Sequence, residues 1–175
     1  MKNNEKGRSM VEMLGVLAVA GVMTMSGTVL YTRALHQRKI NNTIEQVSQI
    51  VSNIKNAFRN RKEITVPTCS SDPRKLIPSG MCAGGKIEYP FGEITLKSEK
   101  KDGELKTYKK FSITFNVKGD AFKKDKEICA KLLTADYGNN ISMTVNGQTV
   151  AVPLQIGTAA TYCQKELTGF TLTVN

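Results

Sequence analysis

The stretch that decides the fold is MLGVLAVAGVMTMSGTVLYT, residues 13–32, which contains no charged residue. An α-helix rises about 1.5 Å per residue, so a helix of this length spans roughly 30 Å, the thickness of the hydrocarbon core of a membrane. We therefore expect a membrane-spanning helix at about residues 13–32.

Glu12 lies directly before this apolar segment. A lone charged side chain in a membrane helix costs about 3 kcal/mol by insertion scales, and such residues are usually paired and functional. The carboxylate of Glu12 is therefore expected to need a partner.

A short charged leader, residues 1–7, precedes the segment and ends in Gly7. Gly7, Arg8, Glu12 and the apolar helix behind them resemble the N-terminus of a type IV prepilin. In that family a membrane aspartyl peptidase cuts after the glycine and methylates the new amine, and the glutamate pairs with an N-terminal amine in the filament. The resemblance implies cleavage between Gly7 and Arg8, N-methylation of Arg8 and an assembly role for Glu12.

Two other interpretations of the same segment are a secretory signal peptide and an ordinary signal anchor. A signal peptide has an apolar core of about 7 to 15 residues, so this segment is too long for one. A signal anchor has the same hydropathy, but it gives no reason for Glu12. Basic residues on both sides of the segment leave its orientation open.

Beyond residue 32 the helix is expected to continue with one apolar face. Apolar residues recur at spacings of three and four, which at about 100° per residue places them within an arc of about 120°. The members of this stripe are Ile40, Ile44, Val47, Ile50, Val51, Ile54 and Phe58. No proline precedes Pro67, so the predicted helix runs to about Asn60, and its stripe is expected to be buried against a head domain.

The chain has 175 residues, which leaves room for one small domain after the helix. We predict a leader at residues 1–7, a long helix at residues 8–60 and a globular head at residues 61–175. Alternation of apolar and polar residues predicts strands at residues 94–96, 111–117, 141–145, 149–152 and 170–174.

Shorter signals complete the predicted head. Asn146 and Gly147 suit a two-residue hairpin turn between two of the strands. Helical spacing predicts short helices at about residues 123–134 and 158–165. The expected fold class is α+β, with an antiparallel sheet packed on the long helix.

Four cysteines, Cys69, Cys82, Cys129 and Cys163, allow three pairings. We prefer Cys69 with Cys82 and Cys129 with Cys163, because the second bridge ties the helix around Ile128 to the segment before the last strand. The type IVb pilins, which the run from Arg8 to Gly15 also resembles, have a bridge like that. Disulfides imply an oxidising compartment, which places the head outside the cytoplasm and the leader inside it.

Catalytic and metal-binding patterns are weak. A zinc site would need close cysteine pairs or histidines, but the chain has no CxxC motif and a single histidine, His36. Residues 80–86 have the spacing of a phosphate-binding loop, but Ile87 replaces the Ser or Thr that should follow, and Pro90 prevents the helix. We therefore predict no enzyme, metal or cofactor, and assign the acids Asp120, Asp125, Glu127 and Asp136 to solvated surface positions.

The formal net charge is +10, which favours anionic partners without specifying one. The densest basic run consists of Lys97, Lys100, Lys101, Lys106, Lys109 and Lys110. A soluble, exposed hairpin explains this run, and the functional alternative is a patch for DNA or another anionic surface.

The sequence therefore favours a structural subunit of a bacterial type IV pilus, most similar to type IVb pilins. The resemblance implies a homopolymer, processing by a prepilin peptidase and contact with the assembly machinery of the inner membrane. It also implies residence in that membrane before assembly, with a periplasmic head, and in the extracellular pilus afterwards. The alternatives are a minor pilin, a type II secretion pseudopilin, and a monomeric membrane-anchored binding protein.

Overall fold

The computed structural model describes residues 5–60, 64–99, 110–164 and 167–175, while the side chains of residues 5–9 and 24–28 lie outside the described part. The chain divides into two compact units, Met1–Lys39 and Ile40–Asn175. The second unit takes in residues 40–58 of the long helix as well as the predicted head.

Helix α1, Glu5–Phe58, passes through both units. In the first unit its described apolar side chains are exposed, from Met10 to Tyr31. No helix in the described part of the chain is both long enough and apolar enough to cross a membrane, so the span predicted at residues 13–32 is not found there. The predicted span includes residues 24–28, whose side chains lie outside the described part.

The second unit is built on one antiparallel sheet of seven strands in the order β1-β2-β3-β4-β7-β5-β6. The strands are β1 Cys82–Ala83, β2 Lys86–Tyr89, β3 Gly92–Glu99, β4 Lys110–Val117, β5 Ile141–Val145, β6 Gln148–Ala151 and β7 Gly169–Val174. The final strand lies between β4 and β5, so the end of the chain is part of the centre of the sheet. The predicted α+β class with an antiparallel sheet is confirmed.

Short helices complete this unit: the 3-10 turn η1 Ser79–Met81, α2 Ala121–Lys124, α3 Lys126–Thr134 and α4 Ile156–Gln164. The helix predicted at about residues 123–134 is two helices, because Asp125 interrupts it in an extended conformation. The carboxylate of Asp125 accepts hydrogen bonds from the backbone N–H groups of Glu127 and Ile128, which caps the start of α3.

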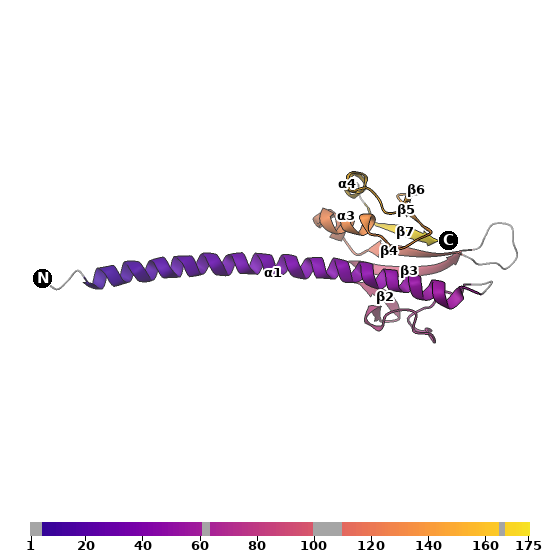
Figure 1. Cartoon of the computed structure of the whole chain (residues 1–175), viewed down its shortest axis with the longest axis horizontal. Helices are drawn as coiled ribbons and strands as arrows, with labels where there is room; N and C mark the ends of the chain where they lie inside the picture. The colour runs from indigo at the N-terminus through magenta and orange to yellow at the C-terminus, as the bar shows by residue number, and fades with distance from the viewer. Residues whose placement is uncertain (1–4, 61–63, 100–109, 165–166) are drawn as a thin grey trace. The chain divides into compact units, whose positions relative to one another are not determined.

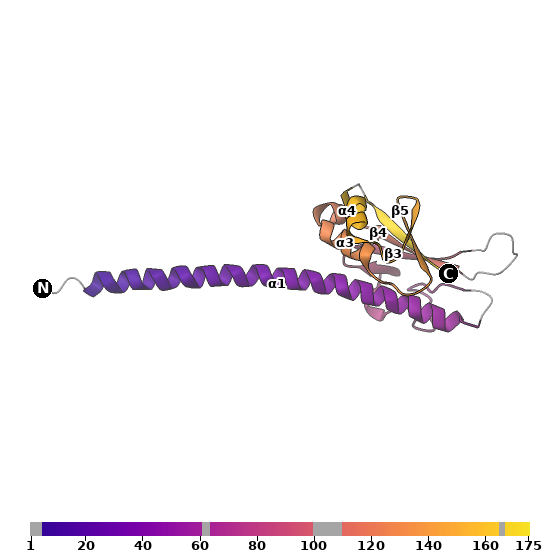
Figure 2. The same cartoon turned by 45° about the horizontal axis from the view of Figure 1, so that its top comes forward.

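Most of the predicted apolar stripe of α1 is buried in the second unit, while Ile44 and Phe58 are half-buried. Ile40, Val47, Ile50 and Ile54 are fully buried in the core. Figures 1 and 2 show residues 40–58 lying beside the strands, with α3 and α4 next to each other on the same unit. A helix with one apolar face is stabilised mainly by such burial, so the sheet fixes this part of α1.

The sheet has one apolar face and one polar face. Phe115 and Phe170 lie opposite each other on β4 and β7 and stack with their ring centroids 4.3 Å apart. On the polar face a row of threonines crosses five strands in register: Thr95, Thr114, Thr171, Thr144 and Thr149. Alternation along each strand produces this division, because neighbouring side chains point to opposite faces.

Two hairpins use turns with positive φ. Asn146 and Gly147, with φ of 49° and 77°, join β5 to β6, as the sequence predicted. Gly84 and Gly85, with φ of 57° and 80°, join β1 to β2 in the same way, although these two strands were not predicted. Two successive residues with positive φ match the twist of a two-residue hairpin.

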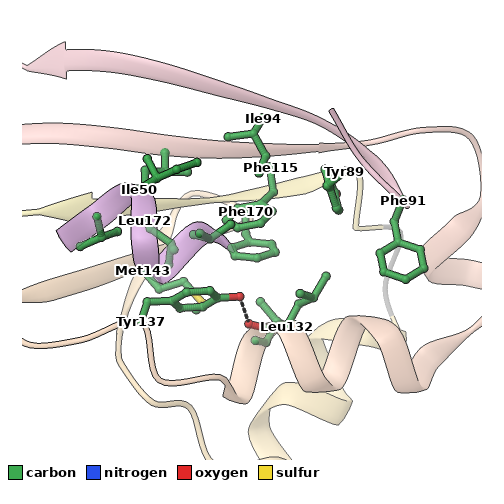
Figure 3. Packing of buried hydrophobic residues seen from close by; sticks show 14 of the residues in the cluster. Ile50, Tyr89, Phe91, Ile94, Phe115, Leu132, Tyr137, Met143, Phe170 and Leu172 are labelled. Carbon is green, nitrogen blue, oxygen red and sulfur yellow. Dashed lines mark hydrogen bonds between the residues drawn. The ribbon is translucent and has the colours of Figure 1, made fainter. Parts of the chain in front are cut away.

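Two buried tyrosines lie between the sheet and α3 in Figure 3. The hydroxyl of Tyr137 donates a hydrogen bond to the carbonyl of Leu132 at 2.8 Å. The hydroxyl of Tyr89 is buried and has no hydrogen-bond partner among the described residues. Burial raises the pKa of both phenols, and for Tyr137 the neighbouring Tyr89 adds to the increase.

The structure pairs Cys69 with Cys82 and Cys129 with Cys163, which confirms the pairing preferred from the sequence. Cys129 on α3 and Cys163 on α4 are both buried, so this bridge ties the two helices together within the core. Cys82 is exposed on β1, at one edge of the sheet.

The two tyrosines are expected to respond in opposite ways to replacement by phenylalanine. Tyr137→Phe leaves the buried carbonyl of Leu132 without its donor and should lower the free energy of unfolding by about 1–2 kcal/mol. Tyr89→Phe removes a buried hydroxyl that lacks a partner, so it should be neutral or stabilising. Thermal unfolding of the full chain in detergent checks both. A large loss of stability in Tyr89→Phe would contradict the assignment of its hydroxyl.

The two disulfides are expected to contribute unequally. The sequence separations are 13 and 34 residues, for which loop entropy gives about 3 and about 4 kcal/mol. Replacing Cys129 and Cys163 together by serine should also place two hydroxyls in the core, and should lower the melting temperature more than the same change at Cys69 and Cys82. Equal melting temperatures for the two double variants would refute this ranking.

Candidate functional site

One face of α1 in the first unit carries a shallow concavity of about 510 Å³. It is lined by Glu12, Gly15, Val16, Val19, Ala20 and Met23, which we call the N-terminal seam. The spacings of three and four residues place all six residues on one side of the helix. A carboxylate therefore lies at one end of a stripe that is otherwise apolar.

The small residues of the seam are not required by the packing of the described chain. A Cβ atom added to Gly15 would meet nothing within 4 Å. Small residues on an apolar helix let the backbone of a second helix approach closely. Gly15 and Ala20 thus leave room for a neighbour along the seam.

The apolar exposure extends around the rest of this part of α1. Met10, Val11 and Met13, which lie outside the seam, are about 70% exposed. Contiguous apolar surface of this kind marks a site of contact with protein or membrane. The described part of the first unit therefore exposes an apolar surface of the kind found at such contacts.

Glu12 is exposed, and no described side chain forms an ion pair with it. Gly7 and Arg8, the predicted cleavage and methylation sites, lie within α1, but their side chains are outside the described part. The partner expected for the carboxylate of Glu12 therefore stays a prediction.

The predicted basic patch falls mostly outside the described residues. Lys100, Lys101, Lys106 and Lys109 belong to residues 100–109, which the structure does not describe. Lys97 is exposed on β3, and Lys110 begins β4 opposite Glu99. The described part of the patch thus consists of two lysines near a glutamate.

The glycine-rich run at residues 80–86 forms the turn η1, the strand β1 and the hairpin to β2. Lys86 at its end forms an ion pair with Glu93 at 2.9 Å, and this hydrogen bond raises the pKa of the ammonium group. The run is therefore part of the sheet edge and closes no phosphate-binding loop within the described chain.

Three of the four acids singled out in the sequence have local structural roles, and the fourth, Asp120, is exposed. Asp125 caps α3, and Asp136 accepts a hydrogen bond from the N–H group of Gly138. The Oε1 atom of Glu127 lies 3.2 Å from the Nζ atom of Lys131 on the same helix. No group of three potential metal ligands gathers anywhere in the described residues.

Glu12 could be predicted from the sequence, whereas the rest of the N-terminal seam was not. The signal was present as small and apolar residues at positions 15, 16, 19 and 20. It was hidden because every neighbouring residue is also apolar, so that no polar face marks the stripe. No protein-family model and no curated protein sequence matches this chain.

Proposed function

We propose that the chain is a structural subunit of a bacterial type IV pilus, most like type IVb pilins, which assembles through its N-terminal helix after cleavage between Gly7 and Arg8. The observation that carries the proposal is the N-terminal seam, an exposed apolar stripe that ends in the single carboxylate of Glu12. The disulfide-bonded head built on residues 40–58 of the same helix supports it.

The exposed apolar residues of α1 need a cover other than water. Fully burying one such side chain is worth about 1.5–3 kcal/mol, and many are exposed in this part of the helix. Before assembly the lipid of the inner membrane covers the exposed apolar side chains of this part of α1. In the filament the helices of neighbouring subunits replace the lipid.

Glu12 selects the position of the neighbour. A carboxylate surrounded by apolar helices is strongly disfavoured unless a cation pairs with it. Cleavage after Gly7 creates a new amine, and the amine of an adjacent subunit supplies that cation. The pair fixes the axial register between subunits, since a shifted neighbour leaves the charge unpaired.

The remaining partners and the location follow from this function. Prepilin peptidase removes residues 1–7, and the inner-membrane machinery extracts the subunit into a homopolymer. The head lies in the periplasm before assembly, where its two disulfides form, and on the extracellular pilus afterwards. DNA or another anionic surface is a candidate ligand of the lysine-rich run from Lys97 to Lys110.

The mature protein is expected to start at Arg8, with a methyl group on its amine. Intact-mass and N-terminal peptide mass spectrometry of protein from cells with an active prepilin peptidase measures this directly. A bacterial strain without the peptidase serves as the control, and the protein from that strain should retain residues 1–7. A Met1 terminus in both would rule out prepilin processing.

Glu12→Gln is expected to leave membrane insertion and cleavage intact but to lower filament yield about tenfold or more. The tenfold figure follows because the variant loses one ion pair, and about 1.4 kcal/mol corresponds to a factor of ten. Glu45→Gln is the matched control, because Glu45 is also an exposed glutamate on α1. Filaments are counted by electron microscopy at equal subunit levels. A filament count in Glu12→Gln equal to that of the unmodified chain would contradict the proposed ion pair.

A further inference from the structure

Charge is divided unequally across the sheet of the second unit. The strands β2, β3 and β4 carry Lys86, Glu88, Glu93, Lys97, Glu99 and Lys110. The strands β7, β5 and β6 carry no charged residue, although they form the other side of the same sheet. Residues 137–164 contain no Asp, Glu, Lys, Arg or His in a chain whose net charge is +10.

We call β5, β6 and α4, residues 141–164, the neutral edge. Its surface is accessible, since Thr149 and Ala151 on β6 and Pro153 after it are exposed. Ile156 at the start of α4 is 76% exposed, the one large apolar side chain of the described second unit with such exposure. An uncharged surface with an exposed isoleucine has the composition of a contact region rather than of a solvated one.

The strand β6 is the open end of the sheet. Within the described chain it pairs with β5 alone. Residues that flank a two-residue hairpin turn exchange both hydrogen bonds, and the pattern alternates along the strands. Gln148 and Val150 therefore bond to β5, while Thr149 and Ala151 direct their N–H and C=O groups to the open side.

The two edges of the sheet are protected differently. The edge strand β1 has two residues and is tied down by the Cys69–Cys82 disulfide. The strand β6 has four residues, Gln148–Ala151, and carries neither a charged residue nor a proline. Proteins normally place charged residues and prolines on edge strands to prevent pairing with another chain, so β6 lacks these two protections.

The charge distribution selects a second copy of this chain as the occupant. Two molecules that each carry +10 repel each other over most of their surfaces, and they approach most easily where neither surface is charged. An antiparallel edge strand is also self-complementary, because a two-fold axis brings the same strand of both copies together in the pairing orientation.

We propose that β6 pairs in antiparallel fashion with β6 of a second copy and joins the two heads through one continuous sheet. With the two-fold axis at Val150, Thr149 of each copy lies opposite Ala151 of the other. The outward N–H and C=O groups of Thr149 and Ala151 then form the new hydrogen bonds. This contact involves the head alone, so it does not depend on the proposed filament function.

The first test is the molar mass of the full chain in a non-ionic detergent, measured by light scattering over a range of protein concentrations. The unmodified chain should form dimers. Thr149→Lys puts a charge on the edge strand and should raise the dimer dissociation constant roughly tenfold or more. Thr95→Lys is the matched control, because Thr95 lies on β3 at the other end of the same row of threonines and should leave the constant unchanged.

Two further measurements separate this contact from association through α1 and from misfolding. Glu12→Gln should leave the head dimer intact, whereas loss of the dimer in that variant would assign it to the helix and overturn the proposal. In the unmodified chain, amide hydrogen exchange of a peptide that covers β6 should slow as concentration rises. The pairing would be refuted if the unmodified chain were monomeric at every concentration, or if amide exchange in β6 did not depend on concentration. Equal dimer dissociation constants for Thr149→Lys and Thr95→Lys would also refute it.

Discussion

Burial of one apolar stripe of α1 against the apolar face of the sheet is the constraint on which the second unit depends. The sheet has a single apolar face, and Ile40, Val47, Ile50 and Ile54 supply the helical surface that covers it. Without these residues the aromatic side chains of β4 and β7 would lose a large part of their cover. Replacing Ile40, Ile50 or Ile54 by alanine would each lower the free energy of unfolding by about 2–5 kcal/mol, which is a large share of the stability of a domain of this size.

In the first unit of the chain, by contrast, the described apolar side chains of the same helix are exposed on all sides. Residues 40–58 have a sheet to cover them, but residues 10–23 have no such cover within the described part of that unit. The function we propose follows from this difference. In the proposed function, lipid and neighbouring helices both cover the N-terminal part, and Glu12 distinguishes the two, because a neighbour with a cation satisfies its charge.

Most of the sheet could be predicted, because β4, β5 and β7 alternate strictly and Asn146-Gly147 is a strong turn signal. The strands β1 and β2 were missed because only Ile87 and Tyr89 alternate there, between a glycine pair and Pro90. For the candidate site, Glu12 could be identified as a lone charge, whereas the seam beside it could not be separated from equally apolar neighbours. The N-terminal boundary of the second unit depends on contacts distant in sequence, which local periodicity cannot report.

The composition of surface filaments tests the central claim most directly. Filaments sheared from cells that express the chain can be purified, and the stoichiometry of their proteins determined by quantitative mass spectrometry. The proposed function predicts that this chain is the most abundant subunit of the filaments. Filaments of normal number and length that lack the chain, with the chain recovered entirely in the membrane fraction, would contradict the claim that its helix builds the polymer.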